Sequence, residues 1–321
     1  MSTYKNAAAC IGFAIVATLT GAPAIAQDDE ISIGALIYAR DSQFWQQIER
    51  GMSDAAEEYG VEFAVGLNRR QIATEAQVVE DFATRGVDAI IMPPLDAQAS
   101  IAAVRRAAEK GITIVDYDAP LSDPDVASHT IGVDSFELAA TVTAEMREKL
   151  DEAGGGKVAL ITLPPTNPNM QARRTGAMSN LEGDDIEIVN EIAAATPEQG
   201  ATAIETVIQR NPDIAAVWAS NSGSLSGAAA AARRTDSDVK LYGVDMSEEL
   251  ARAMLDPEGN VYAVSDQQPY RIGYVSVETA VQSLRGKEPP REVQVDVKVY
   301  SRDDPEGIQS YIDLVESLAG N

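Results

Sequence analysis

Short apolar runs rich in β-branched residues alternate with longer amphipathic stretches along almost the whole chain. The first apolar run is Ile31 to Ala39, and the amphipathic stretch from Phe44 to Tyr59 follows it. A period of about 3.6 residues predicts a helix for the long stretches, and short continuous apolar runs predict buried strands. Apolar strands joined by helical crossovers are typical of a parallel sheet covered on both faces, so the expected fold class is α/β.

The same alternation of predicted strands and helices starts again after residue 134, which indicates two similar Rossmann-like lobes with parallel sheets. No stretch rich in Pro, Gly and Ser separates them, so we expect several short crossings in place of one flexible linker. The expected strands are 31–39, 61–65, 87–92, 112–115, 157–163, 186–192, 214–219, 239–244, 261–264 and 292–300. The expected helices are 44–59, 74–84 (ending at Gly86), 99–110, 137–150, 172–181, 200–210, 225–234, 248–255 and 272–285.

The N-terminus has the order of a cleavable signal peptide. Lys5 precedes an apolar stretch that ends in Ala24-Ile25-Ala26, and acidic residues follow. Small residues flanking Ile25 suit signal peptidase, so residues 1–26 are the expected signal peptide, with export to the periplasm. A membrane anchor is the alternative, but Thr, Gly and Pro residues interrupt the apolar stretch. A lipid anchor on Cys10 is disfavoured because no Leu-containing lipobox precedes it.

The composition of the mature chain excludes several classes of function. Cleavage removes the only cysteine and leaves 24 cations against 50 anions, a net charge of −26. A surface of that charge repels nucleic acid and anionic lipid, so we expect no nucleic-acid partner. About 295 residues normally divide into two domains.

Polar and aromatic side chains follow the predicted strands. In open parallel sheets, ligands bind outside the carboxyl ends of the strands, so two lobes can present these side chains across a cleft. Carboxylates, amides, an arginine and adjacent aromatics suit a polyhydroxylated ligand, because each hydroxyl donates and accepts while a sugar ring packs on an aromatic face. The residues after the strands include Phe44, Trp45, Asp116, Tyr117, Asp118, Asn221, Asp245, Asp266 and Gln267.

These residues resemble the ribose and galactose type of periplasmic sugar-binding protein, from carbohydrate ABC importers, over nearly the whole mature chain. Phe44-Trp45 matches the aromatic pair that sandwiches the sugar ring, and Asp116 matches a hydroxyl-binding aspartate. Four further residues match the family's order and spacing: Arg173 in Ala-Arg-Arg-Thr-Gly, Asn221 in Ala-Ser-Asn-Ser, Asp245 in Tyr-Gly-Val-Asp, and Gln267 in Asp-Gln-Gln-Pro.

The resemblance implies the type I periplasmic binding protein fold with a three-crossing hinge. The N-terminal lobe is then 27–132 with 268–297, and the C-terminal lobe is 133–267 with 298–321. It implies a monomer that closes around a monosaccharide or polyol by hinge rotation and is recognised by an ABC transporter permease. A chemoreceptor is a further candidate partner.

The chain also departs from the ribose binders. Tyr117 stands where an arginine is common, and the extra carboxylate Asp118 follows it; Ser42 and Ser222 replace an asparagine and an aspartate. Tyr117 is a candidate ligand-binding residue that could instead pack between the lobes. The ligand could therefore be another aldose, a polyol, a nucleoside or a hydroxylated signal molecule.

Several of these residues have a structural alternative. Trp45 and Trp218 could be core residues, Asp245 could cap a helix, and Asp118 and Asp266 could be caps or solvated acids.

An enzyme is not expected. His129 is the only histidine, and no zinc motif or phosphate loop is present, so we expect no metal and no cofactor. Asp116 with Asp245 could serve a glycosidase, which is the alternative from the enzyme class. The ligand-sensing half of a LacI-like repressor shares the fold, but a signal peptide occupies the position of its DNA-binding helices.

Overall fold

The computed structural model describes Met1 and residues 31–163, 168–235 and 237–319, and residues 31–321 form one compact unit. Apart from Met1, the expected signal peptide lies outside the described residues, including Cys10 and the cleavage site after Ala26. Within the described ranges, no helix has both the length and the apolar character needed to cross a bilayer.

In the described part of the chain, six parallel strands form the first sheet, in the order β11-β5-β4-β3-β1-β2. Its middle strands are buried on both faces, as the four buried residues of β3 illustrate. The strands are β1 (Ser32–Ile37), β2 (Glu62–Leu67), β3 (Ala89–Met92), β4 (Thr113–Tyr117), β5 (His129–Gly132) and β11 (Glu292–Gln294).

The second sheet has the order β12-β10-β9-β8-β6-β7. Its strands are parallel except β12, which pairs antiparallel with β10 at the edge. They are β6 (Gly156–Thr162), β7 (Ile186–Ala193), β8 (Ile214–Ala219), β9 (Lys240–Val244), β10 (Val261–Asp266) and β12 (Lys298–Ser301). The expected α/β class with two Rossmann-like lobes is therefore confirmed.

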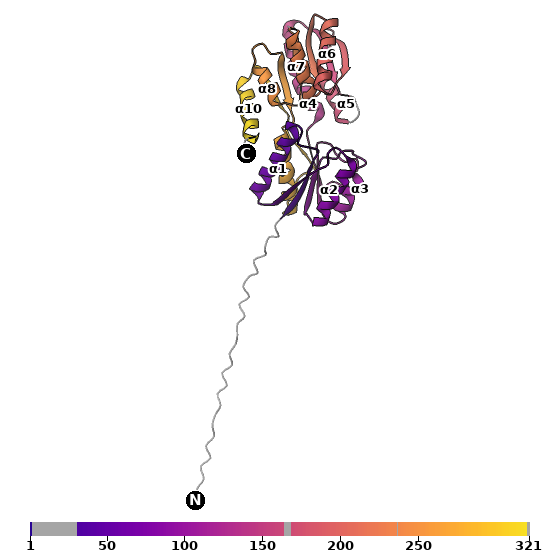
Figure 1. Cartoon of the computed structure of the whole chain (residues 1–321), viewed down its shortest axis with the longest axis vertical. Coiled ribbons are helices and arrows are strands. Elements are labelled where there is room, and N and C mark those ends of the chain that lie inside the picture. The colour runs from indigo at the N-terminus through magenta and orange to yellow at the C-terminus, as the bar shows by residue number, and fades with distance from the viewer. Residues whose placement is uncertain (2–30, 164–167, 236, 320–321) are drawn as a thin grey trace. The chain divides into compact units, whose positions relative to one another are not determined.

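Helices cover both faces of each sheet (Figure 1). On the first sheet, α1 (Gln43–Tyr59) and α9 (Pro269–Leu284) cover one face, and α2 (Ile72–Arg85) and α3 (Ile101–Ala108) cover the other. On the second sheet, α4 (Ser135–Ala153) and α5 (Pro168–Met178) cover one face. The other face carries α6 (Pro197–Arg210), α7 (Ser222–Arg234), α8 (Glu248–Leu255) and α10 (Pro305–Ala319).

Two glycines let α1 and α9 pack backbone against backbone. A Cβ atom at Gly51 would lie 2.0 Å from the carbonyl oxygen of Tyr270, and one at Gly273 would lie 2.0 Å from that of Ile48. Such distances exclude a side chain at either position. This contact holds α1, whose first turn carries Phe44 and Trp45, against a helix that starts immediately after Gln267 and Gln268.

The chain passes between the two sheets at three places. The first is between β5 and α4, the second is between β10 and α9, and the third is between β11 and β12. Each passage is short, since two to three residues separate the paired elements. The lobe boundaries expected from the sequence remain a prediction.

Three elements differ from the sequence-based expectations. The single late strand expected at 292–300 is wrong: β11 and β12 are separate strands, one in each sheet. The short strand β5 and the helix α10 were not anticipated. In β5 the alternation is brief and contains His129, so periodicity alone gave too weak a signal.

Candidate functional site

Among the described residues, left-handed backbone occurs at non-glycine residues after four strands: at Arg69 and Arg70 after β2, and after β4, β9 and β10. Asp118 directly follows β4 and has φ 68°, and Asp245 directly follows β9 with φ 68°. Gln268, just after β10, has φ 56°. Non-glycine residues rarely adopt this left-handed conformation, and such positions cluster at functional sites. Three of the strand ends singled out in the sequence therefore also have an unusual backbone conformation.

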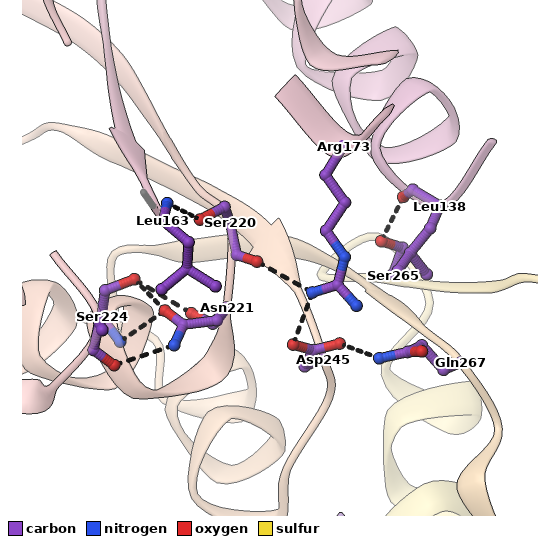
Figure 2. Close-up of polar contacts among 10 residues, drawn as sticks. Leu138, Leu163, Arg173, Ser220, Asn221, Ser224, Asp245, Ser265 and Gln267 are labelled. Carbon is purple, nitrogen blue, oxygen red and sulfur yellow. Dashed lines mark hydrogen bonds and ion pairs between the residues drawn. The ribbon is translucent and has the colours of Figure 1, made fainter. Parts of the chain in front are cut away.

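Arg173, Asp245 and Gln267 form one polar network in the second lobe (Figure 2). The Nη1 atom of Arg173 donates to Asp245 Oδ2 at 3.0 Å and to the carbonyl oxygen of Ser220 at 3.1 Å. Gln267 Nε2 donates to Asp245 Oδ1 at 2.6 Å. Arg173 is only 5% exposed, and its Nε has no hydrogen-bond partner in the described part of the chain. The network thus orients a buried guanidinium that keeps one donor available.

The neighbouring arginine points elsewhere. Arg174 Nε and Nη2 donate to the two carboxylate oxygens of Glu191, at 2.6 and 2.8 Å, on the exposed side of α5. Only Arg173 of this pair therefore faces the strand ends of the second sheet, as expected from the sequence motif.

A buried carboxylate, Asp116, and a half-buried one, Asp118, lie at the end of β4 in the first lobe. Asp116 is 1% exposed; its Oδ2 accepts from the Leu121 N–H at 2.8 Å, and its Oδ1 has no partner among the described residues. Burial raises the pKa of Asp116 above its usual range. Burial also raises the pKa of Asp118 to about 6, with Asp245 adding to the increase and the Arg173 guanidinium opposing it.

Asp118 lies close to residues of both sheets. Its carbonyl oxygen accepts from Asn169 Nδ2 at 3.2 Å, and Asn169 is on α5, the helix that carries Arg173. The influence of Arg173 and Asp245 on its pKa agrees with this placement. The first-sheet acid and the second-sheet network therefore belong to one polar group.

The aromatic residues form a cluster on the first lobe. Trp45 lies 5.0 Å from Phe44, edge to face, and 4.5 Å from Tyr38, measured between ring centroids. Phe44 is partly exposed, whereas Trp45 is almost buried. Tyr117 is completely buried in the core, and its hydroxyl donates to the Leu36 carbonyl at 2.8 Å. The structure thus places Tyr117 beneath this cluster and not among the polar groups.

Asn221 caps α7. Its Oδ1 accepts from the Ser224 N–H at 3.1 Å and from the Ser224 hydroxyl, and its Nδ2 donates to the Ala195 carbonyl at 2.9 Å. Most of its hydrogen-bonding capacity is used inside the second lobe (Figure 2).

Asp266 and Asp118 are more central than the sequence indicated, since both were open to interpretation as caps or solvated acids. Asp266 is 4% exposed, and burial together with Asp245 raises its pKa to about 7. The N–H groups of Gln268 and Gln267 and the charge of Lys298 oppose that increase. The position of both acids, directly at a strand end, was the signal that could have placed them. The expected core position of Trp218 is observed, with no exposed surface.

Among the described residues, no group of three or more His, Cys, Asp or Glu side chains is arranged to hold a metal ion.

A family model and individual relatives both match this chain to periplasmic binding proteins. The family described as "Periplasmic binding protein domain" matches residues 33–288. The ribose import binding protein of Bacillus subtilis (strain 168) is 25% identical over 271 residues, covering 84% of this chain and 87% of that protein. The D-allose-binding periplasmic protein of Escherichia coli (strain K12) is 27% identical over 249 residues, covering 74% and 79%.

A solved structure has the same fold. The periplasmic solute binding protein of an ABC transporter from Actinobacillus succinogenes 130z, with bound D-allose, has a TM-score of 0.79. It is 23% identical, and the match covers 87% of this chain and 100% of that chain. At this identity the likeness establishes the fold.

Proposed function

This chain belongs to the periplasmic binding protein domain family, and from that premise we propose that it is the solute-binding component of a carbohydrate ABC importer. The resemblance to periplasmic sugar-binding proteins is confirmed by the family match. The relatives are binding proteins of ABC transporters, so the expectation that the chain is not an enzyme is confirmed as well. The ligand in this proposal is a monosaccharide or a polyol.

The observation that carries the proposal is a pair of unsatisfied buried groups, one in each lobe. Arg173 Nε is a donor, and Asp116 Oδ1 is an acceptor; neither has a partner in the described part of the chain. Leaving a buried polar group unpaired costs about 1–3 kcal/mol, so both would gain from a bound molecule. A hydroxyl both donates and accepts, and a polyhydroxylated ligand satisfies groups of either kind.

The aromatic cluster and the remaining polar groups support the same ligand class. Phe44 offers a partly exposed ring next to Trp45, on which the C–H face of a sugar can pack. Asp245 and Gln267 supply further acceptor and donor atoms beside Arg173. The relatives point the same way, because they include a ribose import binding protein and a D-allose-binding protein.

Binding in this proposal couples to hinge closure. Elements of the two lobes already touch: Asn169 donates to Asp118, and the Glu248 N–H donates to Gln43 Oε1 at 3.0 Å. A ligand that contacts both lobes only when they are closed shifts the population toward the closed form. The permease would recognise that form.

The same proposal covers location and assembly. The N-terminal 26 residues act as a cleaved signal peptide, and the mature protein works in the periplasm as a monomer. It needs no cofactor.

The mature chain, residues 27–321, tests this proposal in a thermal-shift screen. The library contains aldoses, polyols, sugar acids, nucleosides and amino acids. A ligand at about 100 times its Kd stabilises the protein by about 2.7 kcal/mol, which raises Tm measurably. Shifts confined to a few aldoses or polyols are expected, with a smaller radius of gyration in X-ray scattering when they bind. Shifts with nucleosides or amino acids alone would overturn the ligand class.

A further inference from the structure

Asp118 connects the two lobes at the centre of the site. It follows β4 directly, and its left-handed backbone (φ 68°) turns the chain away from the sheet after Tyr117 enters the core. Its carbonyl oxygen accepts from Asn169 on α5 at 3.2 Å. This contact places Asp118, a residue of the first lobe, beside the helix that carries Arg173.

The charges around Asp118 are unbalanced. The guanidinium of Arg173 is already paired with Asp245 at 3.0 Å. Both Arg173 and Asp245 act on the pKa of Asp118, in opposite directions. Among the described residues, no hydrogen bond to the Asp118 carboxylate is found. Its carboxylate is therefore an acceptor without a protein donor among the described residues, and the neighbouring Arg173 guanidinium already has a counter-ion in Asp245.

This arrangement discriminates between ligands by charge. A ligand hydroxyl can donate to Asp118 and satisfy it. A ligand carboxylate or phosphate would instead meet Asp118 and Asp245, beside an Arg173 guanidinium that is already paired with Asp245. Like charges brought together at an interface cost several kcal/mol. Tyr117, the neighbour of Asp118 in the chain, lies in the core and brings no positive charge to the site.

We infer that Asp118 is a specificity-determining residue of the site, whose carboxylate accepts from a ligand hydroxyl and selects neutral polyhydroxylated ligands over sugar acids and sugar phosphates. The inference rests on the proposed function, because it concerns the ligand of the same site.

Matched ligand pairs test it by isothermal titration calorimetry at pH 7.5. The pairs are galactose with galacturonic acid, glucose with glucuronic acid, and ribose with ribose 5-phosphate, extended to the acid of whichever aldose binds in the screen. The wild-type protein is expected to bind the neutral member about 100-fold more tightly than the charged member. Equal affinity for the two members would overturn the inference.

Asp118→Asn removes the charge and tolerates the left-handed backbone, since asparagine adopts it readily. The affinity of this variant for the neutral sugar should fall about tenfold. The ratio of its affinities for the neutral and the charged ligand should also fall about tenfold. The control is Asp125→Asn, which removes one charge from a side chain that is 90% exposed in the same lobe and should change neither quantity. An unchanged preference in Asp118→Asn contradicts the inference.

The two failures are distinguishable. If wild-type protein binds no aldose or polyol, the proposed function fails and this inference fails with it. If wild-type protein binds a neutral sugar but Asp118→Asn behaves as Asp125→Asn does, only the role of Asp118 is refuted. The wild-type preference is measured without any variant, so it stands even if Asp118→Asn folds poorly.

Discussion

The guanidinium of Arg173 donates to the carboxylate of Asp245 across 3.0 Å, although the two residues are 72 positions apart in the sequence. One comes from α5 and the other from the end of β9, and Gln267 at the end of β10 holds the second carboxylate oxygen. Arg173 is buried and Asp245 is half-buried, so the pairing compensates mainly for the desolvation of the guanidinium. A prepared donor set of this kind binds a ligand without first having to order itself.

Replacing Arg173 should abolish most ligand binding. Arg173→Ala removes the buried donors and leaves Asp245 without its counter-ion, so we expect affinity for the cognate sugar to fall at least about 100-fold. The matched control is Arg174→Ala, which removes an exposed arginine paired with Glu191. Titration calorimetry on both variants checks this. Equal losses in the two variants, or none in Arg173→Ala, would place the site elsewhere.

Asn221 should matter first as a helix cap. Asn221→Ala removes the acceptor of the Ser224 N–H, so the free energy of unfolding should fall by about 1 kcal/mol. Asn221→Asp keeps that acceptor but loses the donor to Ala195, so it should lie between wild type and alanine. Urea denaturation measures the order. A stability of Asn221→Ala equal to that of wild type would refute the capping role and would leave ligand contact as its main function.

Stability should decline as pH rises from about 4 to about 7. The pKa of Asp266 is raised to about 7 in the folded chain, whereas an unfolded aspartate has a pKa of about 3.9. In this interval the folded chain keeps a proton that the unfolded chain has lost, so the free energy of unfolding falls with pH and levels off above pH 7. The groups acting on Asp266 are Asp245, Lys298 and the N–H groups of Gln267 and Gln268.

Asp266→Asn tests this prediction because it resembles the protonated form. The free energy of unfolding of this variant should depend on pH less steeply than that of the wild type. The variant should exceed the wild type in stability by the largest amount near pH 8. Asp118, with a pKa raised to about 6, contributes in the same direction and leaves a residual slope. Urea denaturation at pH 5, 6, 7 and 8 measures both slopes, and identical slopes would contradict the prediction.

Export should remove the first 26 residues. Expression of the full chain in a Gram-negative host should give a periplasmic protein whose mass corresponds to a start at Gln27. Ala24→Leu should block cleavage, because signal peptidase accepts small residues at that position. Mass spectrometry of the periplasmic fraction distinguishes these forms, and an intact N-terminus in the wild-type protein would favour the anchored alternatives.

Local patterns predicted most of the secondary structure. The helix expected to end at Gly86 does so, with Gly86 in the left-handed conformation at φ 75°. Strand β8 and helix α8 have the expected bounds. These elements are decided by periodicity and by end signals within a few residues, which a sequence shows directly. The division of 292–300 into strands of different sheets could not be predicted, because the apolar pattern of a strand does not show which strand it pairs with.

Part of the candidate site could also be predicted from the sequence, and part could not. Its residue types were readable because strand ends in a parallel sheet collect polar side chains, and Arg173, Asp245 and Gln267 indeed lie together. No local pattern separated Tyr117, whose side chain is buried in the core, from Asp118, whose carbonyl oxygen accepts from Asn169 on α5. That choice depends on the left-handed backbone after β4 and on the packing above it.

The order of residues in this chain by itself determined the α/β class, the two lobes and the polar strand ends, because hydrophobic periodicity and turn chemistry act over short distances along the backbone. Only the tertiary structure decided which polar groups meet. Arg173 with Asp245, and Asp118 with Asn169, are contacts between segments far apart in the sequence. Their burial and pairing follow from how sheets and helices pack, which no local pattern encodes.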